Sequence, residues 1–269
     1  MKNKEFVGVG IAAFIILGLA LWFMATHPAP ALQTSTGTEQ EAQNNEQIID
    51  LQQYYEVRAL FPKAAALSAS SEAGAGIQAA ALMKAWVTDT IDTFKKESGL
   101  NDLTQEDIDM QGIGKDDRKY ALTIAYTTHM SPSTITYLYE IYANTLGAHP
   151  NTYYHSFTFD TSTGINLAIG NLFVPGANYL TKLSQISRAQ LPGIIAEREQ
   201  VAVSEVPMDM IEDGTKPVVE SFQTFYVEGD NLVIVFSPYA VGPYVLGTVE
   251  FPVPLSQLSD ILKPGYKVQ

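Results

Sequence analysis

Residues 120–142 read YALTIAYTTHMSPSTITYLYEIY, and the hydrophobic period of this stretch decides the fold class. Large apolar side chains occupy every second position on both sides of a Ser131-Pro132 turn: Tyr120, Leu122, Ile124 and Tyr126 before it, and Ile135, Tyr137, Tyr139 and Ile141 after it. A period of two is typical of a strand with one buried face. The stretch therefore predicts two half-buried strands joined by a turn.

Apolar residues recur at steps of three and four on either side of this hairpin, which indicates helices. One helix is expected over about residues 72–96, where Gly99 is well placed to end it. A second helix is expected over about 178–191, ended by Pro192-Gly193. Further strands are expected at 54–60, 152–160, 218–227, 232–236 and 244–253, and a short helix at 255–262. Runs of strands separated by a few long helices predict an α+β fold, a mainly antiparallel sheet with the two longer helices packed on it.

The N-terminal residues predict a transmembrane helix in front of this fold. Residues 6–25 carry no charge, and about 20 residues match the thickness of a bilayer core. Lys2 and Lys4 precede the span and no Lys or Arg follows until Arg58, so the positive-inside rule places the N-terminus in the cytoplasm and the rest outside. Ala29-Pro30-Ala31 resembles a cleavage site, which leaves a secreted form open.

Four consecutive segments are expected. They are a cytoplasmic stub over 1–5, a single-pass anchor in the cytoplasmic membrane over 6–26, a flexible tether over 27–47 and an extracytoplasmic α+β domain over 48–269. The tether is expected because Pro, Thr, Gln, Asn and Glu dominate there, and such a segment cannot bury a core. A division of the last segment into two subdomains near 130–145 is left open.

The charge balance restricts the partners of this domain. The chain has 269 residues, with 16 Lys and Arg against 29 Asp and Glu, which gives a formal net charge of −13. An acidic chain repels phosphate backbones, so we expect no nucleic-acid partner. A basic protein or a neutral molecule is a better match.

Sequence patterns of catalytic or metal sites are lacking. There is no cysteine, no G-x-S-x-G elbow and no H-E-x-x-H pattern, so we predict no catalytic residue, no metal and no cofactor. Residues 107–112 begin like a calcium loop, but Arg118 stands at the twelfth position, where a carboxylate is required. His155 shares a strand face with Phe157 and Phe159, so we expect it to be partly buried and hydrogen-bonded.

Two segments rich in proline and glycine interrupt the strands. They are Leu146-Gly-Ala-His-Pro-Asn151 and Phe236-Ser-Pro-Tyr-Ala-Val-Gly-Pro-Tyr-Val-Leu-Gly247. Shaped loops on a rigid sheet are common binding sites. The predicted binding residues are Gly147, His149, Asn151, Pro238, Tyr239, Pro243 and Tyr244. The alternative is that the tyrosines only close the end of the core.

These segments also carry a family resemblance, together with Tyr55-Glu-Val-Arg-Ala-Leu-Phe-Pro62, Asn171-Leu-Phe173 and Phe222-Gln-Thr-Phe225. In this order they resemble the extracytoplasmic domain of RsiV-type lysozyme-sensing anti-sigma factors. They are also similar to the non-catalytic N-terminal region of PdaC-type peptidoglycan deacetylases. The family's usual Gly-Gly-Ala-His-Gly-Asn loop has Leu146 at its first position and Pro150 at its fifth, so its backbone geometry is expected to differ.

The resemblance implies a membrane-anchored binding module of the cell envelope. Its expected partner is a lysozyme-like basic protein or peptidoglycan. Sigma-factor signalling and deacetylation are not expected, because five residues precede the span and the metal-binding motifs of a deacetylase are absent. An envelope enzyme that uses His149 with a nearby carboxylate, and a purely structural envelope protein, remain as alternatives.

Overall fold

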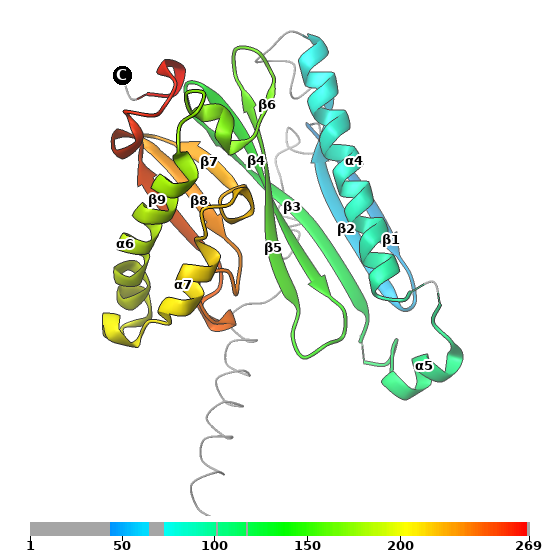
Figure 1. Ribbon diagram of the computed structural model, residues 1–269. Helices are drawn as coiled ribbons and strands as arrows, with labels where there is room; N and C mark the ends of the chain where they lie inside the picture. Colours follow the sequence, from blue (N-terminus) through cyan, green and yellow to red (C-terminus); the bar gives the residue numbers. More distant parts are fainter. Residues whose placement is uncertain (1–43, 65–72, 101, 117, 268–269) are drawn as a thin grey trace, which may run out of the picture. The chain divides into compact units, whose positions relative to one another are not determined.

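The computed structural model describes residues 44–64, 73–100, 102–116 and 118–267 (Figure 1). The strands are β1 (Asn45–Leu51), β2 (Tyr55–Pro62), β3 (Tyr120–Met130), β4 (Thr134–Asn144), β5 (Asn151–Asp160), β6 (Asn166–Leu167), β7 (Phe225–Glu228), β8 (Asn231–Phe236) and β9 (Val249–Pro254). The α-helices of the described residues are α4 (Ala73–Glu97), α5 (Gln105–Gln111), α6 (Tyr179–Glu199) and α7 (Met208–Gly214). The 3₁₀ turns are η1 (Ile169–Leu172), η2 (Val203–Glu205), η3 (Val219–Ser221), η4 (Tyr244–Leu246), η5 (Leu255–Leu258) and η6 (Pro264–Tyr266). The predicted α+β class is confirmed.

The strands form two sheets. Six strands pair in the order β1-β2-β3-β4-β5-β6, and three pair as β7-β8-β9. The prediction of a mainly antiparallel sheet holds only in part, because β2 and β3 pair in parallel in the larger sheet. Parallel neighbours need a long crossover, and α4 and α5 provide it here. The prediction that both longer helices pack on one sheet is wrong, because α4 packs on the larger sheet and α6 on the smaller one (Figure 1).

The stretch that decides the fold class forms the centre of the larger sheet. β3 and β4 pair antiparallel from Ala121 with Asn144 to Met130 with Ile135, as the alternation predicts. Their apolar faces meet the stripe of α4 in one core, where Trp86 stacks on His155 at 4.6 Å. The possible subdomain boundary near 130–145 falls on β4, which pairs with strands on both sides.

The smaller sheet packs against α6 and α7. One face of β7–β9 carries Phe225, Ile234 and Phe251 into a core that includes Leu191 and Ile195 of α6. The predicted stop at Pro192-Gly193 is wrong, because α6 continues to Glu199. A proline inside a helix costs about 3 kcal/mol, since it removes a hydrogen bond. Burial of Leu191, Pro192 and Ile195 offsets this cost.

A thinner interface joins the two sheets. The buried Leu138 of β4 meets Val233 and Val235 of β8, with Tyr226 beside them. Polar contacts add to this interface: Ser156 Oγ accepts a hydrogen bond from the backbone N–H of Phe225 at 3.0 Å. The two sheets are thus held at a fixed distance, which positions the loops at their ends.

Several predicted boundaries need correction. The strand expected over 218–227 is limited to β7 and the one over 244–253 to β9, because η3 and η4 occupy the first parts. The short helix at 255–262 is the 3₁₀ turn η5. β1, α5 and α7 were not predicted. Within the described residues no helix is long and apolar enough to span a membrane, and the predicted span over 6–26 lies outside them.

Candidate functional site: an aromatic cluster on two loops

Two loops that are distant in the sequence meet at one place. Residues 145–150 connect β4 to β5, and residues 237–248 connect β8 to β9. His149 of the first loop contacts Tyr239 and Tyr244 of the second. We call these three residues the aromatic cluster.

Hydrogen bonds fix the orientation of the His149 ring. Its Nδ1 lies 2.9 Å from the carbonyl oxygen of Pro150, and its Nε2 lies 3.2 Å from the hydroxyl of Tyr239. A carbonyl only accepts, so we assign the proton of the neutral imidazole to Nδ1. Nε2 then accepts from Tyr239. The Tyr244 hydroxyl donates to the same Pro150 carbonyl at 2.9 Å.

The three rings pack as a group. His149 stacks on Tyr244 with ring centroids 4.1 Å apart, and Tyr239 lies 5.4 Å from Tyr244. Burial, and then the neighbouring Tyr239, raise the pKa of Tyr244. Burial and the nearby Tyr244 likewise raise the pKa of Tyr142, which places this β4 residue beside the cluster.

Tyr239 is the outermost member, since 52% of it is exposed. The end of the core is closed instead by Val241 and Leu246, which are almost fully buried. Closing the core is therefore not the role of Tyr239. A large, stiff ring that is held in place while it faces solvent is typical of a contact residue in an interface.

Both loops carry a residue other than glycine in the left-handed backbone region. Leu146 has φ +61° and Tyr239 has φ +70°. This conformation costs L-residues about 1–2 kcal/mol, so surrounding contacts must maintain it. Leu146 stands where the similar family has glycine, and its backbone N–H donates to Asn144 Oδ1 at 3.0 Å.

Helix α6 supports the longer loop at both ends. At the start of the loop this support runs through α7. Arg188 of α6 donates to the carbonyl of Glu212 at 2.8 Å and so ties α7 to α6. Gly214 at the end of α7 then lies against the loop, where an added Cβ would be 1.8 Å from the Ala240 carbonyl oxygen. At the other end, Arg198 donates to the carbonyl of Thr248 at 2.8 Å.

The loop is also joined to β5. The backbone N–H of Tyr154 donates to Ser237 Oγ at 3.2 Å. Burial raises the pKa of Tyr154 to about 12, with smaller contributions from Glu140 and Glu250. These two carboxylates therefore lie near the base of the loop.

The other predicted site residues shape the loops. Gly147, Asn151 and Pro243 are exposed and Pro238 is half-buried. Gly147 has no side chain, and within the described residues the side chains of Asn151, Pro238 and Pro243 form neither a hydrogen bond nor a ring contact with the aromatic cluster. The sequence analysis missed Tyr142, although strand alternation places its side chain on the face of β4 that lies away from the buried Ile141. It also missed Gly214, for which the sequence holds no signal.

The remaining motif residues are structural. Phe173, Phe222 and Phe225 are buried in the core under α6. Asn171 Oδ1 accepts from the backbone N–H of Ala168 at 2.8 Å and so closes a turn. The carboxylate of Asp107, the first residue of the dismissed calcium loop, forms a capping box with Thr104.

The other two histidines of the folded region belong to packing contacts. His155 is partly buried, as predicted, but its ring stacks on Trp86, and burial lowers its pKa. His129 stacks on Tyr226 at 3.7 Å, with Nδ1 3.2 Å from Glu228. In the described part of the chain, no group of three or more acidic, histidine or cysteine side chains is arranged to hold a metal.

Residues 170–256 match the family described as "Protein of unknown function (DUF3298)". The matched region contains α6, α7, β7–β9 and the loop with Tyr239 and Tyr244. The peptidoglycan-N-acetylmuramic acid deacetylase PdaC of Bacillus subtilis is 27% identical over 185 residues, which are 68% of this chain and 36% of PdaC. The predicted resemblance to PdaC-type proteins is thereby confirmed.

A second relative is the esterase Rv3036c of Mycobacterium tuberculosis, 24% identical over 155 residues. These cover 56% of this chain and 64% of the esterase, so the chain spans less than two thirds of either relative.

Two crystal structures share the fold. A DUF3298 family member from Bacteroides fragilis aligns with a TM-score of 0.55 at 15% identity, covering 82% of this chain and 93% of that one. A family protein from Pseudomonas aeruginosa aligns with a TM-score of 0.50 at 12% identity, covering 84% and 96%.

Proposed function

We propose that this chain is a binding module of the cell envelope and that the aromatic cluster is its recognition surface. The observation that carries the proposal is the contact of His149 with Tyr239 and Tyr244, which joins two loops into one exposed group. The similarity to PdaC, a peptidoglycan-N-acetylmuramic acid deacetylase, favours an envelope setting for the module. The charge-free stretch at residues 6–25 would anchor it, with the described domain outside the cell.

The partner that we propose is a basic protein such as a lysozyme-like hydrolase. The net charge of −13 would attract such a protein and raise its association rate. Tyr239 presents its ring to solvent, and a lysine or arginine of the partner could lie over it. The cell-wall glycan is the alternative partner of the same surface.

A binding measurement on the full chain in detergent tests this proposal. We expect a basic lysozyme to bind with a dissociation constant of about 1 μM or tighter. Association should slow as salt is raised, because screening weakens charge attraction. The matched control is the same lysozyme with its lysines succinylated, which keeps the fold and reverses the charge. Equal binding of the two forms, or no binding of either, would contradict a basic protein partner.

A hydrolase is the second candidate, because an esterase is among the relatives. The mechanism expected for such an enzyme pairs His149 with a carboxylate within hydrogen-bond reach. The ring nitrogens of His149 are instead engaged by the Pro150 carbonyl and the Tyr239 hydroxyl. Ester hydrolysis that is lost in His149→Ala but kept in His129→Ala would favour this candidate over the binding module.

A further inference from the structure

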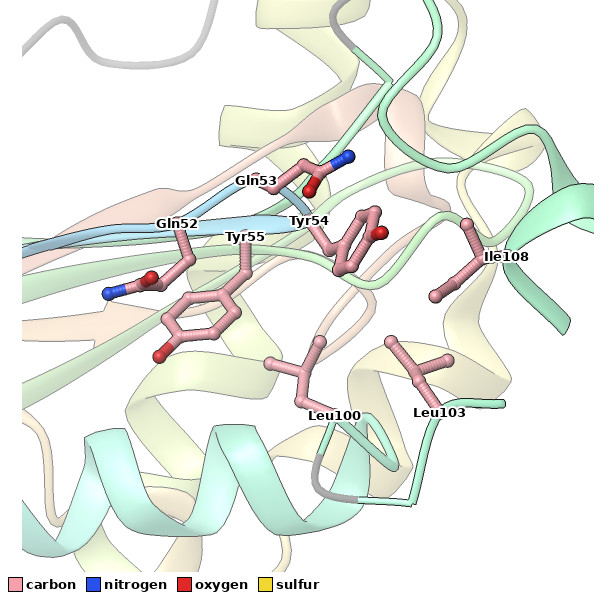
Figure 2. A pocket seen from close by; sticks show the side chains of 7 residues that line it. All are labelled: Gln52, Gln53, Tyr54, Tyr55, Leu100, Leu103 and Ile108. Carbon is pink, nitrogen blue, oxygen red and sulfur yellow. The ribbon is translucent and has the colours of Figure 1, made fainter. Parts of the chain in front are cut away.

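A cavity of about 440 Å³ opens beside the turn that joins β1 to β2 (Figure 2). Its volume lies within the range of small-ligand sites. The lining comes from the β1–β2 turn and the start of β2, from Leu100 and Leu103 between α4 and α5, and from Ile108 of α5. The lining residues are Gln52, Gln53, Tyr54, Tyr55, Leu100, Leu103 and Ile108. None of them belongs to the aromatic cluster.

The lining is uncharged and has two kinds of surface. In Figure 2, the side chains of Leu100, Leu103 and Ile108 converge toward the ring of Tyr54. Glutamine amides and tyrosine hydroxyls supply the polar part. An ionic ligand would find no counter-charge among these lining side chains, so the cavity favours a neutral ligand.

Contacts behind the cavity hold its walls. Asp50 accepts hydrogen bonds from the Tyr55 hydroxyl at 2.8 Å and from Gln52 Nε2 at 2.7 Å. Lys95 donates to Asp50 at 2.7 Å and lies over the Tyr55 ring at 5.1 Å, which compensates the charge of Asp50. Gly114 lies beside the Tyr54 ring, because a Cβ added to it would be in van der Waals contact with that ring at 3.4 Å.

Two polar groups of the wall remain available to a ligand. Among the described residues, the side-chain amide of Gln53 and the hydroxyl of Tyr54 make no hydrogen bond, whereas the side chains of Gln52 and Tyr55 both donate to Asp50. A purely apolar ligand would desolvate these groups without pairing them, at a cost of about 1–3 kcal/mol for each. The matching ligand therefore carries both an apolar face and neutral hydrogen-bonding groups.

From this geometry we infer that the cavity binds a neutral sugar that carries an acetamido group. The C–H face of the sugar ring packs on Tyr54, and the acetamido methyl contacts the leucine and isoleucine side chains. The acetamido N–H and C=O pair with Gln53 and the Tyr54 hydroxyl. This site is separate from the aromatic cluster and does not depend on its proposed role.

The test is titration calorimetry of the full chain, in a detergent without a sugar headgroup, with the tetrasaccharide of N-acetylglucosamine. We expect binding with a dissociation constant of about 1 mM or tighter. The fully deacetylated, cationic tetrasaccharide should bind at least about tenfold more weakly. No heat up to about 10 mM of the acetylated probe would overturn the inference.

Variants locate the site. Gln53→Ala, in an exposed turn, and Leu103→Trp, which fills the cavity, should each weaken binding at least about tenfold. Met110→Ala, which removes an exposed side chain of α5 that does not line the cavity, should leave it unchanged. Loss of sugar binding in Tyr239→Ala alone would place the sugar on the aromatic cluster and overturn the inference. Lysozyme binding is measured in a separate experiment, so a failure of one proposal can be told from a failure of the other. A near-ultraviolet circular dichroism spectrum that matches the unaltered chain confirms that each variant is folded.

Discussion

Nε2 of His149 lies 3.2 Å from the hydroxyl of Tyr239, although 90 residues separate them in the chain. The contact exists because β4 ends and β5 begins where the loop between β8 and β9 starts, and Ser237 Oγ ties that loop to Tyr154. The position of Tyr239 therefore depends on packing well outside the loop.

Gly214→Ala is expected to displace the loop that carries Tyr239. The new Cβ would lie 1.8 Å from the Ala240 carbonyl oxygen, so either the loop or α7 must shift. We expect the affinity for a basic partner to fall at least about tenfold, although Gly214 is not part of the aromatic cluster. Surface plasmon resonance on the variant measures this loss.

Gly193→Ala is the matched control for this change. Gly193 lies inside α6, and an added Cβ would meet nothing within 4 Å. Alanine favours a helix over glycine, so we expect unchanged affinity and about 0.5–1 kcal/mol greater stability. Equal affinities of the Gly214 and Gly193 variants would show that α7 does not position the loop.

Tyr239→Gly and Tyr239→Ala separate the backbone of this residue from its side chain. Both variants lose the ring, but only glycine adopts φ +70° without strain. We expect Tyr239→Gly to have a free energy of unfolding about 1 kcal/mol higher than Tyr239→Ala, as measured by urea unfolding. A more stable alanine variant would mean that the loop leaves the left-handed conformation.

Asp50 is expected to make stability depend on acid. Hydrogen bonds from Lys95, Gln52 and Tyr55 lower its pKa from the ordinary 3.8 to about 2. A carboxylate whose pKa is lower in the folded than in the unfolded state stabilises the fold. This contribution is fully present when the pH is above the unfolded pKa, and it is lost as the pH falls through the folded pKa of about 2. Because Asp50 is partly exposed, we expect on the order of 1 kcal/mol.

Urea unfolding of the unaltered chain and of Asp50→Asn at pH 7 and at pH 2 measures this contribution. The unaltered chain should be more stable at pH 7, and most of the difference should vanish at pH 2. The other carboxylates titrate in both proteins and cancel. A difference that persists unchanged at pH 2 would argue against a charge-dependent role of Asp50.

Tyr139→Phe is expected to stabilise the fold. Tyr139 is fully buried, and its hydroxyl has no hydrogen-bond partner among the described residues. Removing an unpaired buried hydroxyl should raise the free energy of unfolding by about 1 kcal/mol.

The same substitution at a bonded tyrosine is the control. In Tyr226→Phe the chain loses a 2.6 Å hydrogen bond to Glu250, so stability should fall by about 1 kcal/mol or more. A loss of stability in Tyr139→Phe as well would indicate that its hydroxyl is hydrogen-bonded in solution.

The spacing of apolar residues predicted the helices and strands that bury one face and are long enough for the spacing to repeat. The β3–β4 hairpin and α4 agree with prediction to within a few residues. β1 was missed because NEQIIDL is a half-exposed edge strand whose polar residues resemble the preceding tether. The parallel pairing of β2 with β3 joins segments about 60 residues apart, and no local pattern reports it.

For the site, the sequence predicted which loops are shaped but not that they meet. Proline and glycine mark the loops of His149 and Tyr239 through their own backbone preferences. The contact between them follows from how the two sheets pack. Leu146 and Tyr239 adopt positive φ values that their residue types disfavour, so only the folded structure shows them.

The affinity of a basic lysozyme for the full chain and for two tyrosine variants tests the central claim most directly. Tyr239→Ala removes the exposed ring of the aromatic cluster, and Tyr153→Ala removes another exposed tyrosine, which strand alternation places on the opposite face of β5 from Tyr154. We predict that Tyr239→Ala weakens binding at least about tenfold while Tyr153→Ala leaves it unchanged. Equal affinities of the two variants and the unaltered chain would contradict the aromatic cluster as the recognition surface.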